Sequence, residues 1–185
     1  MAIALVTGAT GLVGSHLVER LRAGGWTVRA LTRNPSAARG ALAALDAEPV
    51  AGDVLDAQSF ADAARGCDAV VHAAALITAR GGWDAYDATN VRGTRNAVAA
   101  ARAAGARLLH VSSVAVYGAG TRYGHGDHGT TEDLPLAALP VHEWYARSKR
   151  ESEALVLDAH RRGELWAAAI RPSVLYGPRD RQFVP

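Results

Sequence analysis

The alternation of short apolar runs with longer segments rich in alanine, leucine and arginine constrains the fold of this chain most. Apolar runs predict strands near residues 2–7, 26–32, 48–52, 68–74, 106–112 and 165–171. The longer segments predict helices near residues 12–23, 36–46, 56–65, 83–104 and 142–162. This alternation is typical of βαβ units and of a parallel sheet. We expect an α/β fold with a doubly wound, Rossmann-like sheet of order 3-2-1-4-5-6, in which ligands bind at the carboxyl ends of the strands.

Length and composition exclude several classes of protein. A chain of 185 residues with 49% hydrophobic and 21% charged residues predicts one globular domain over residues 1–185. The net charge is +2 and the arginines are scattered, so we expect no nucleic-acid partner. Cys67 is the single cysteine and has no internal disulfide partner, which fits a reducing compartment. No leader or membrane span is evident, so the sequence predicts a cytoplasmic protein without membrane association.

A glycine-rich turn follows the first expected strand. The sequence TGATGLVG places glycines at positions 8, 11 and 14, where the next helix begins. Backbone N–H groups of such a turn, together with the helix dipole, can bind a pyrophosphate. A glycine triplet alone is weak evidence, but its place between strand and helix favours dinucleotide binding over a turn without a ligand. The expected contacts here are Gly8, Thr10, Gly11, Leu12, Val13 and Gly14.

The end of the second expected strand indicates which dinucleotide is bound. An NAD site usually has an acidic residue there for the ribose hydroxyls, whereas this chain reads VRALTRNP with Arg33 in that place. An arginine can bind the 2′-phosphate of NADP, and no acidic residue opposes that phosphate. We therefore expect NADP(H) to be preferred, with NAD(H) as the alternative. The competing interpretation is that Arg33 is one of many solvated arginines.

A tyrosine and a lysine lie four residues apart in the last expected helix. Lys149 is the only lysine among the 20 lysine and arginine residues, which suggests a chemical need for an ammonium at that position. The spacing places Tyr145 and Lys149 on one helix face. A phenol has a pKa of about 10 in water, and a nearby cation together with an oxidised nicotinamide would favour the phenolate. Tyr145 is thus a candidate general acid and base.

Two expected loops interrupt the alternation, at residues 76–83 and 118–141. The second contains His125, Asp127 and His128, whose spacing could chelate a metal ion. No second pair of ligands lies nearby, so we favour ordinary exposed side chains and expect no metal site.

Seven segments, in order, resemble the extended short-chain dehydrogenase/reductases, also called the NAD-dependent epimerase/dehydratase family. They are TGATGLVG at 7–14, GDVLD at 52–56, HAAA at 72–75, NVRGT at 90–94, SSVAVYG at 112–118, YARSK at 145–149 and RPSVLYGP at 171–178. The resemblance covers essentially the whole chain. The glycine spacing resembles the extended branch of the family rather than its shorter relatives.

The resemblance implies a role for each matching residue. Tyr145 would be the acid and base, Lys149 would bind the ribose, and Ser113 would orient the reacting oxygen. Asp53 and Val54 would contact the adenine, and the central ribose and phosphates would be contacted by His72, Ala73, Ala74 and Ala75. Asn90 would be a supporting residue of the cofactor site. The nicotinamide would be contacted by Pro172, Ser173 and Val174. Taken singly, Asp53 could be a helix cap, Asn90 a core amide and Ser113 a strand-end hydroxyl. Their joint occurrence at the family's spacing favours the site.

The activity implied is NAD(P)(H)-dependent hydride transfer between the nicotinamide and a carbonyl or secondary alcohol. One alternative is a nucleotide-sugar epimerase that retains NAD, so the expected partner is a small carbonyl compound or a sugar nucleotide. A sugar dehydratase is less favoured because Val114 and Ala115 stand where such relatives have an acidic pair. Members often dimerise through the helices that correspond to 83–104 and 142–162, so the resemblance implies a second copy of this chain as a partner in a homodimer.

The family resemblance also predicts what lies after the sixth strand. Members continue into a smaller C-terminal substrate region, whereas this sequence ends at Pro185, soon after that strand. The chain is then expected to be a fragment, a truncated form or a naturally short protein, and a nucleotide-binding module without catalysis is the third interpretation of its function.

Overall fold

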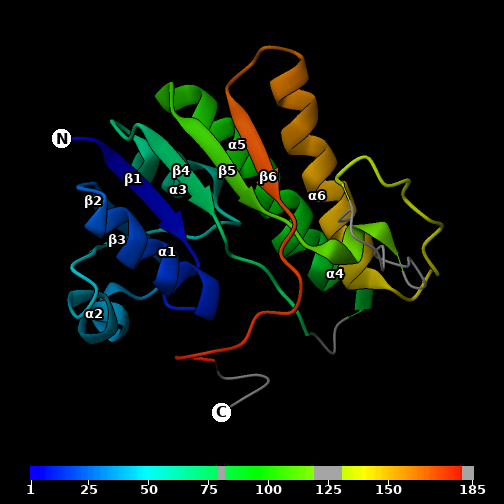
Figure 1. The fold of residues 1–185 in the computed structure, drawn as a ribbon. Coiled ribbons are helices and arrows are strands. Elements are labelled where there is room, and N and C mark those ends of the chain that lie inside the picture. The colour runs from blue at the N-terminus through cyan, green and yellow to red at the C-terminus, as the bar shows by residue number, and fades with distance from the viewer. Residues whose placement is uncertain (79–81, 119–130, 181–185) are drawn as a thin grey trace.

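The computed structural model describes residues 1–78, 82–118 and 131–180, which are organised around a parallel sheet (Figure 1). Its strands are β1 (Ile3–Thr7), β2 (Thr27–Thr32), β3 (Glu48–Ala51), β4 (Ala69–His72), β5 (Arg107–Val111) and β6 (Ala167–Ile170). The strand order is β3-β2-β1-β4-β5-β6, and each neighbouring pair is parallel. The expected doubly wound α/β fold and its strand order are confirmed.

The helices flank both faces of the sheet. They are α1 (Leu12–Ala23), α2 (Pro35–Ala43), α3 (Ala57–Ala64), α4 (Gly82–Tyr86), α5 (Gly93–Ala104) and α6 (Trp144–Arg161), with a π-helical segment η1 (Asp87–Arg92) and a 3-10 turn η2 (Val114–Tyr117). The expected single helix over 83–104 is therefore three consecutive elements, α4, η1 and α5. None of the described helices is long and apolar enough to cross a membrane.

Two apolar clusters form the core, one on each face of the sheet. Leu5 points into the first cluster, where it joins Phe60 of α3, side chains of α5 and Val156 of α6. The next residue of β1, Val6, points into the second cluster with Val18 of α1 and Leu42 of α2. Successive side chains of a strand face opposite sides of the sheet, so β1 contributes to both clusters.

The register of the strands brings their carboxyl ends to one edge. Thr7 at the end of β1 pairs with Leu31 of β2 and with His72 of β4. His72 pairs in turn with His110 of β5, and Val111 pairs with Ile170 of β6. The segments that follow these strands therefore gather along the same edge.

Candidate functional site

A cavity of about 920 Å³ lies at the carboxyl edge of the sheet. Its volume is within the range of pockets that bind small molecules and cofactors. Most residues expected from the sequence line it: Gly8, Thr10, Gly11, Leu12, Val13, Gly14, Arg33, Asp53, Val54, Ala73, Ala74, Ala75, Ser113, Tyr145, Lys149, Pro172, Ser173 and Val174. The fold thus brings together residues that are far apart in the sequence, while His72 and Asn90 lie outside this wall.

The glycine turn between β1 and α1 forms one side of the cavity. Gly8 has a φ of +69°, and a Cβ there would lie 2.8 Å from the backbone N of Ala74. A Cβ at Gly14 would lie only 2.1 Å from the carbonyl O of Gly8. Both positions therefore require glycine for the backbone segments to approach each other. No acidic residue occupies the first turn of α1, so the positive end of the helix dipole favours an anion in the cavity.

His72 and Asn90 are buried behind the wall of the cavity and hold it in place. The backbone N–H of Ala74 donates to Thr7 Oγ1 at 3.0 Å, and that hydroxyl lies 2.9 Å from Nδ1 of His72. Burial lowers the pKa of His72 to about 3, and the charge of Lys149 lowers it further in the same direction, so the ring is neutral. The structure therefore assigns His72 a contact with Thr7 rather than a place in the cavity wall.

Asn90 connects η1 to two other parts of the wall. Its side-chain amide accepts from the N–H of Leu76 at 2.7 Å and donates to the carbonyl of Leu76 at 2.9 Å. The same Nδ2 donates to Ser148 Oγ of α6 at 2.9 Å. Asn90 thus fixes the segment after β4 against the helix that carries Tyr145, and it does not line the cavity itself.

Tyr145 lies in the first turn of α6 and lines the cavity together with Ser113. Ser113 in turn caps η2, where its Oγ accepts from the N–H of Ala115 at 3.1 Å. Burial raises the pKa of Tyr145, Ser113 opposes that effect, and Tyr86 adds a smaller upward contribution. Burial therefore sets the direction of the shift, and the pKa of Tyr145 lies above its ordinary value rather than below it.

Lys149 is buried, with 2% of its surface exposed. Its Nζ donates to the carbonyl O of Val111 at 2.6 Å, which anchors the ammonium at the end of β5. Burial lowers the pKa of Lys149 to about 8, while the carboxylate of Glu153 acts in the opposite direction. The lysine is thus a constrained cation on the wall of the cavity.

Arg33 and Asp53 lie near the end of the cavity formed by β2 and β3. Arg33 is exposed and borders the cavity. Asp53 Oδ1 accepts from the N–H of Leu55 at 2.9 Å, whereas the N-cap of α3 is Asp56. The alternative of Asp53 as the cap of that helix is therefore wrong, because Asp53 closes the preceding turn and also lines the cavity.

A second, smaller cavity of about 290 Å³ adjoins Tyr145. It is lined by Tyr86, Ala115, His142, Glu143, Trp144, Tyr145 and Ala146. Tyr145 and Ala115 line both cavities, so these two residues border the large cavity as well as the small one. The smaller cavity has aromatic side chains in its wall.

Sequence reasoning missed several residues of the larger cavity. Most of them flank an expected residue: Thr7, Leu31, Thr32, Gly52, Leu55, Leu76, Ile77, Thr89, Val111, Ser112, Val114, Ala115 and Leu175. Arg179 and Asp180 also line it and had no sequence signal. The guanidinium of Arg179 forms two bonds of 2.7 Å with the carboxylate of Glu19 on α1, a residue distant in sequence.

His125, Asp127 and His128, at which no metal site is expected, lie outside the described residues. Within residues 1–78, 82–118 and 131–180, no group of three His, Cys, Asp or Glu side chains is arranged to hold a metal ion.

Known proteins resemble this chain along nearly its whole length. A ketoreductase acting on 4-hydroxy-2-methyl-3-oxo-4-farnesyl-3,4-dihydroquinoline-1-oxide, from Stigmatella aurantiaca, is 36% identical over 97% of this chain and 52% of its own length. A 2-alkyl-3-oxoalkanoate reductase from Shewanella oneidensis is 33% identical over 98% of this chain and 47% of its own. The chain therefore spans about half the length of these curated relatives.

Solved structures agree with the sequence relatives. DesIV, a dTDP-glucose 4,6-dehydratase from Streptomyces venezuelae solved with NAD bound, superposes with a TM-score of 0.79 and 33% identity over 99% of this chain and 60% of its own. The family model described as the NAD dependent epimerase/dehydratase family matches residues 4–185. With the glycine turn, the parallel sheet and the Tyr145–Lys149 pair in place, the chain belongs to the NAD dependent epimerase/dehydratase family.

Proposed function

We propose that residues 1–185 form one NAD(P)-binding domain of an oxidoreductase that reduces a ketone, with Tyr145 as the proton donor. The observation that carries this proposal is the position of Tyr145, which lines both cavities and shares the wall of the larger one with Ser113. A cofactor in the large cavity and a carbonyl compound in the small one would meet at this phenol.

The residues of the large cavity fit a dinucleotide. The glycine turn and the N-terminus of α1 favour a pyrophosphate, and Ser112 Oγ on the wall is buried without a hydrogen-bond partner among the described residues. Arg33 would bind a 2′-phosphate, and Pro172, Ser173 and Val174 would border the nicotinamide. When bound, the nicotinamide supplies the hydride.

The protein groups around Tyr145 would polarise the carbonyl and protonate its oxygen. Ser113 and Tyr145 would donate hydrogen bonds to an oxygen on which negative charge develops. Because the pKa of Tyr145 is raised, the phenol is protonated at neutral pH, which favours donation of a proton in the direction of reduction. The cationic Lys149 favours negative charge nearby as the proton leaves the phenol.

The substrate class proposed is a bulky, mostly apolar ketone. The two curated relatives described above are reductases whose names specify substrates with farnesyl or alkyl groups. Tyr86 and Trp144 give the small cavity aromatic walls that suit apolar groups.

A nucleotide-sugar enzyme, epimerase or dehydratase, is the second candidate, because DesIV is a dTDP-glucose 4,6-dehydratase and its fold superposes on this chain. A dehydratase remains less favoured, since Val114 and Ala115 replace the acidic pair. Tightly retained NAD in the purified protein would favour the epimerase.

The test is the Tyr145→Phe variant, assayed with NADPH and a panel of alkyl and cyclic ketones. We expect loss of turnover, because the proton donor is absent, while the Kd for NADPH measured by nicotinamide fluorescence changes less than about twofold. Tyr176→Phe, at an exposed position of the 171–180 segment, is the matched control and should retain activity. Undiminished turnover by Tyr145→Phe would contradict the assignment.

A further inference from the structure

Arg171 lies beside Ser113 where β5 and β6 end. The N–H of Ser112 donates to the carbonyl of Ile170 at 2.7 Å, and the N–H of Val114 donates to the carbonyl of Pro172 at 3.0 Å. These two bonds bracket Ser113 on one segment and Arg171 on the other. A displacement of the backbone at Arg171 is therefore transmitted directly to Ser113.

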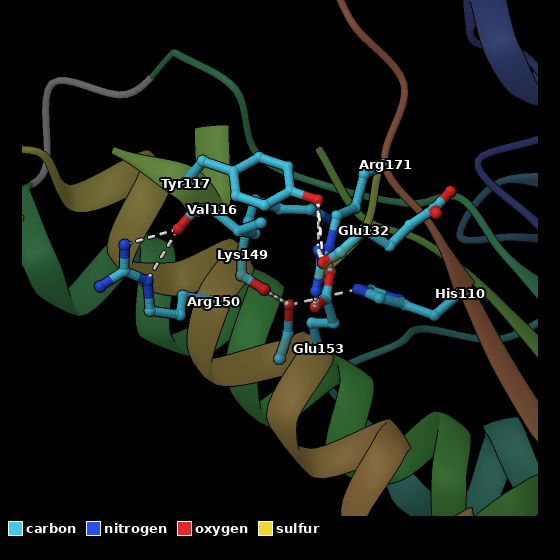
Figure 2. Close-up of polar contacts among 9 residues, drawn as sticks. His110, Val116, Tyr117, Glu132, Lys149, Arg150, Glu153 and Arg171 are labelled. Atoms are coloured by element: carbon cyan, nitrogen blue, oxygen red, sulfur yellow. Dashed lines mark hydrogen bonds and ion pairs between the residues drawn. The ribbon is translucent and has the colours of Figure 1, made fainter. Parts of the chain in front are cut away.

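The side chain of Arg171 reaches the helix that carries Tyr145. Its Nη2 donates to Glu153 Oε1 at 2.6 Å, and its Nε lies 3.1 Å from both oxygens of that carboxylate (Figure 2). Glu153 follows Lys149 by one turn of α6 and Tyr145 by two, so the three side chains share a helix face. The Glu153–Arg171 pair thus joins the strand end beside Ser113 to the helix of Tyr145.

The same guanidinium also holds the far end of η2, the turn that Ser113 caps. Its Nη1 donates to Tyr117 Oη at 2.6 Å and to the carbonyl of Glu132 at 3.1 Å (Figure 2). The guanidinium carbon Cζ of Arg171 lies 4.8 Å from the centre of the Tyr117 ring. Ser113 caps the start of η2 and Tyr117 ends it, so one arginine restrains both the backbone beside Ser113 and the end of the turn that Ser113 caps.

Burial makes this arrangement stiff. The side chains of Arg171 and Glu153 are 18% and 6% exposed. Two charges this far from water are tolerated only while they stay paired and hydrogen-bonded, so the pair has few alternative arrangements. An exposed ion pair would give no such restraint.

We propose that the Glu153–Arg171 pair sets the position of Ser113 relative to Tyr145, and that both are positioning residues for the reaction. The effect that we expect on turnover rests on the proposed function, whereas the effect on the position of Ser113 does not. Neither side chain lines either cavity, so both act through Ser113 and η2.

The structural test uses Glu153→Gln and Arg171→Lys, with tyrosine labelled at Cζ by carbon-13 and the Tyr145 signal assigned from Tyr145→Phe. The shift of this carbon reports the hydrogen bond of the phenol. We expect both variants to move the Tyr145 signal in the direction in which Ser113→Ala moves it. Combined with Ser113→Ala, Glu153→Gln should add no further movement, because the Ser113 hydroxyl through which it acts is already absent.

The matched control is Arg102→Ala, which removes an exposed ion pair with Glu164 at 3.1 Å and should leave the signal unchanged. Glu153→Asp retains the charge with a shorter reach and serves as the second variant if Glu153→Gln does not fold. An unmoved Tyr145 signal in folded Arg171→Lys and in a folded Glu153 variant would overturn the proposal, and so would an equal movement in Arg102→Ala.

The kinetic test measures kcat and the Kd for NADPH on the same variants. We expect kcat to fall by about tenfold or more with a Kd changed less than about twofold, because the donors to the carbonyl move while the cofactor walls do not. An unchanged kcat in a variant whose Tyr145 signal has moved would overturn the catalytic consequence. Absence of turnover in the wild-type chain would count against the proposed function, and the carbon-13 result would still decide the positioning of Ser113.

Discussion

At the scale of the residue, Lys149 carries a charge that the fold opposes. Burial lowers its pKa to about 8 from an ordinary value of 10.5, and a contact with the carbonyl of Val111 and the charge of Glu153 compensate only in part. An uncharged side chain of similar length would be easier to bury. Lys149 is the only lysine in a chain whose other basic residues are arginines. Its burial therefore indicates a role in chemistry rather than in packing.

The stability of Lys149→Met relative to the wild type should depend on pH. The unfolded lysine holds its proton up to about pH 10.5 and the folded one only up to about pH 8. Between these values the unfolded state binds more protons, so the free energy of unfolding of the wild type rises with pH, by up to roughly 3 kcal/mol. Urea denaturation of both proteins from pH 7 to 10 measures this pH dependence. Subtracting the free energy of unfolding of the variant from that of the wild type removes the contribution of the other titrating groups. A constant difference between them would show that the lysine's pKa is not lowered.

At the scale of the element, the glycine turn before α1 depends on close backbone contact. A Cβ at position 14 would lie 2.1 Å from the carbonyl of Gly8, so Gly14→Ala must displace the turn and should lower the free energy of unfolding by about 3 kcal/mol or more. Gly40 in the middle of α2 has no atom within 4 Å of its Cβ position. Gly40→Ala should therefore raise stability by about 0.5–1 kcal/mol. Thermal and urea denaturation compare the stability of the two variants. Equal changes in the free energy of unfolding would contradict the proposed dependence of the glycine turn on close backbone contact.

The elements themselves were largely predictable from sequence. Apolar runs and the capping Gly105, which has a φ of +67°, predict the strands and the end of α5 correctly. The π-helical segment η1 was missed because its pattern of polar and apolar residues resembles that of an α-helix. Asn90 in η1 bonds to Leu76 and Ser148, and partners from other elements leave no local trace in the sequence.

Polar contacts between elements show the same limit. Arg150 of α6 donates to the carbonyl of Val116 at 2.9 Å (Figure 2). It also donates to the carbonyl of Ala137 at 2.8 Å, which ties the 131–139 segment to η2. The motifs that revealed Tyr145, Lys149 and Ser113 say nothing of this contact. The residues bearing the chemistry were thus easier to predict than those arranged around them.

At the scale of the whole molecule, the large cavity is assembled from both ends of the chain. The segment after β6 crosses the carboxyl edge of the sheet toward α1 (Figure 1), where Arg179 pairs with Glu19. The sequence could not predict this pair, since only the topology brings its members together. The described walls run from Thr7 to Asp180, so a cofactor placed there would contact both halves of the sheet.

Because residues 7–180 supply these walls, the 185-residue chain should bind the cofactor on its own. A ligand that binds only the folded state stabilises it by about 2.7 kcal/mol at 100 times its Kd, so NADPH should raise the melting temperature measurably. NADH should raise it less, because it lacks the 2′-phosphate that Arg33 would bind. In Arg33→Ala the two nucleotides should become equivalent, whereas Arg39→Ala, an exposed arginine on α2, should keep the preference. Equal shifts for both nucleotides in the wild type would make Arg33 a solvated side chain and favour an enzyme that uses NAD, and no shift with either would contradict a self-sufficient cofactor site.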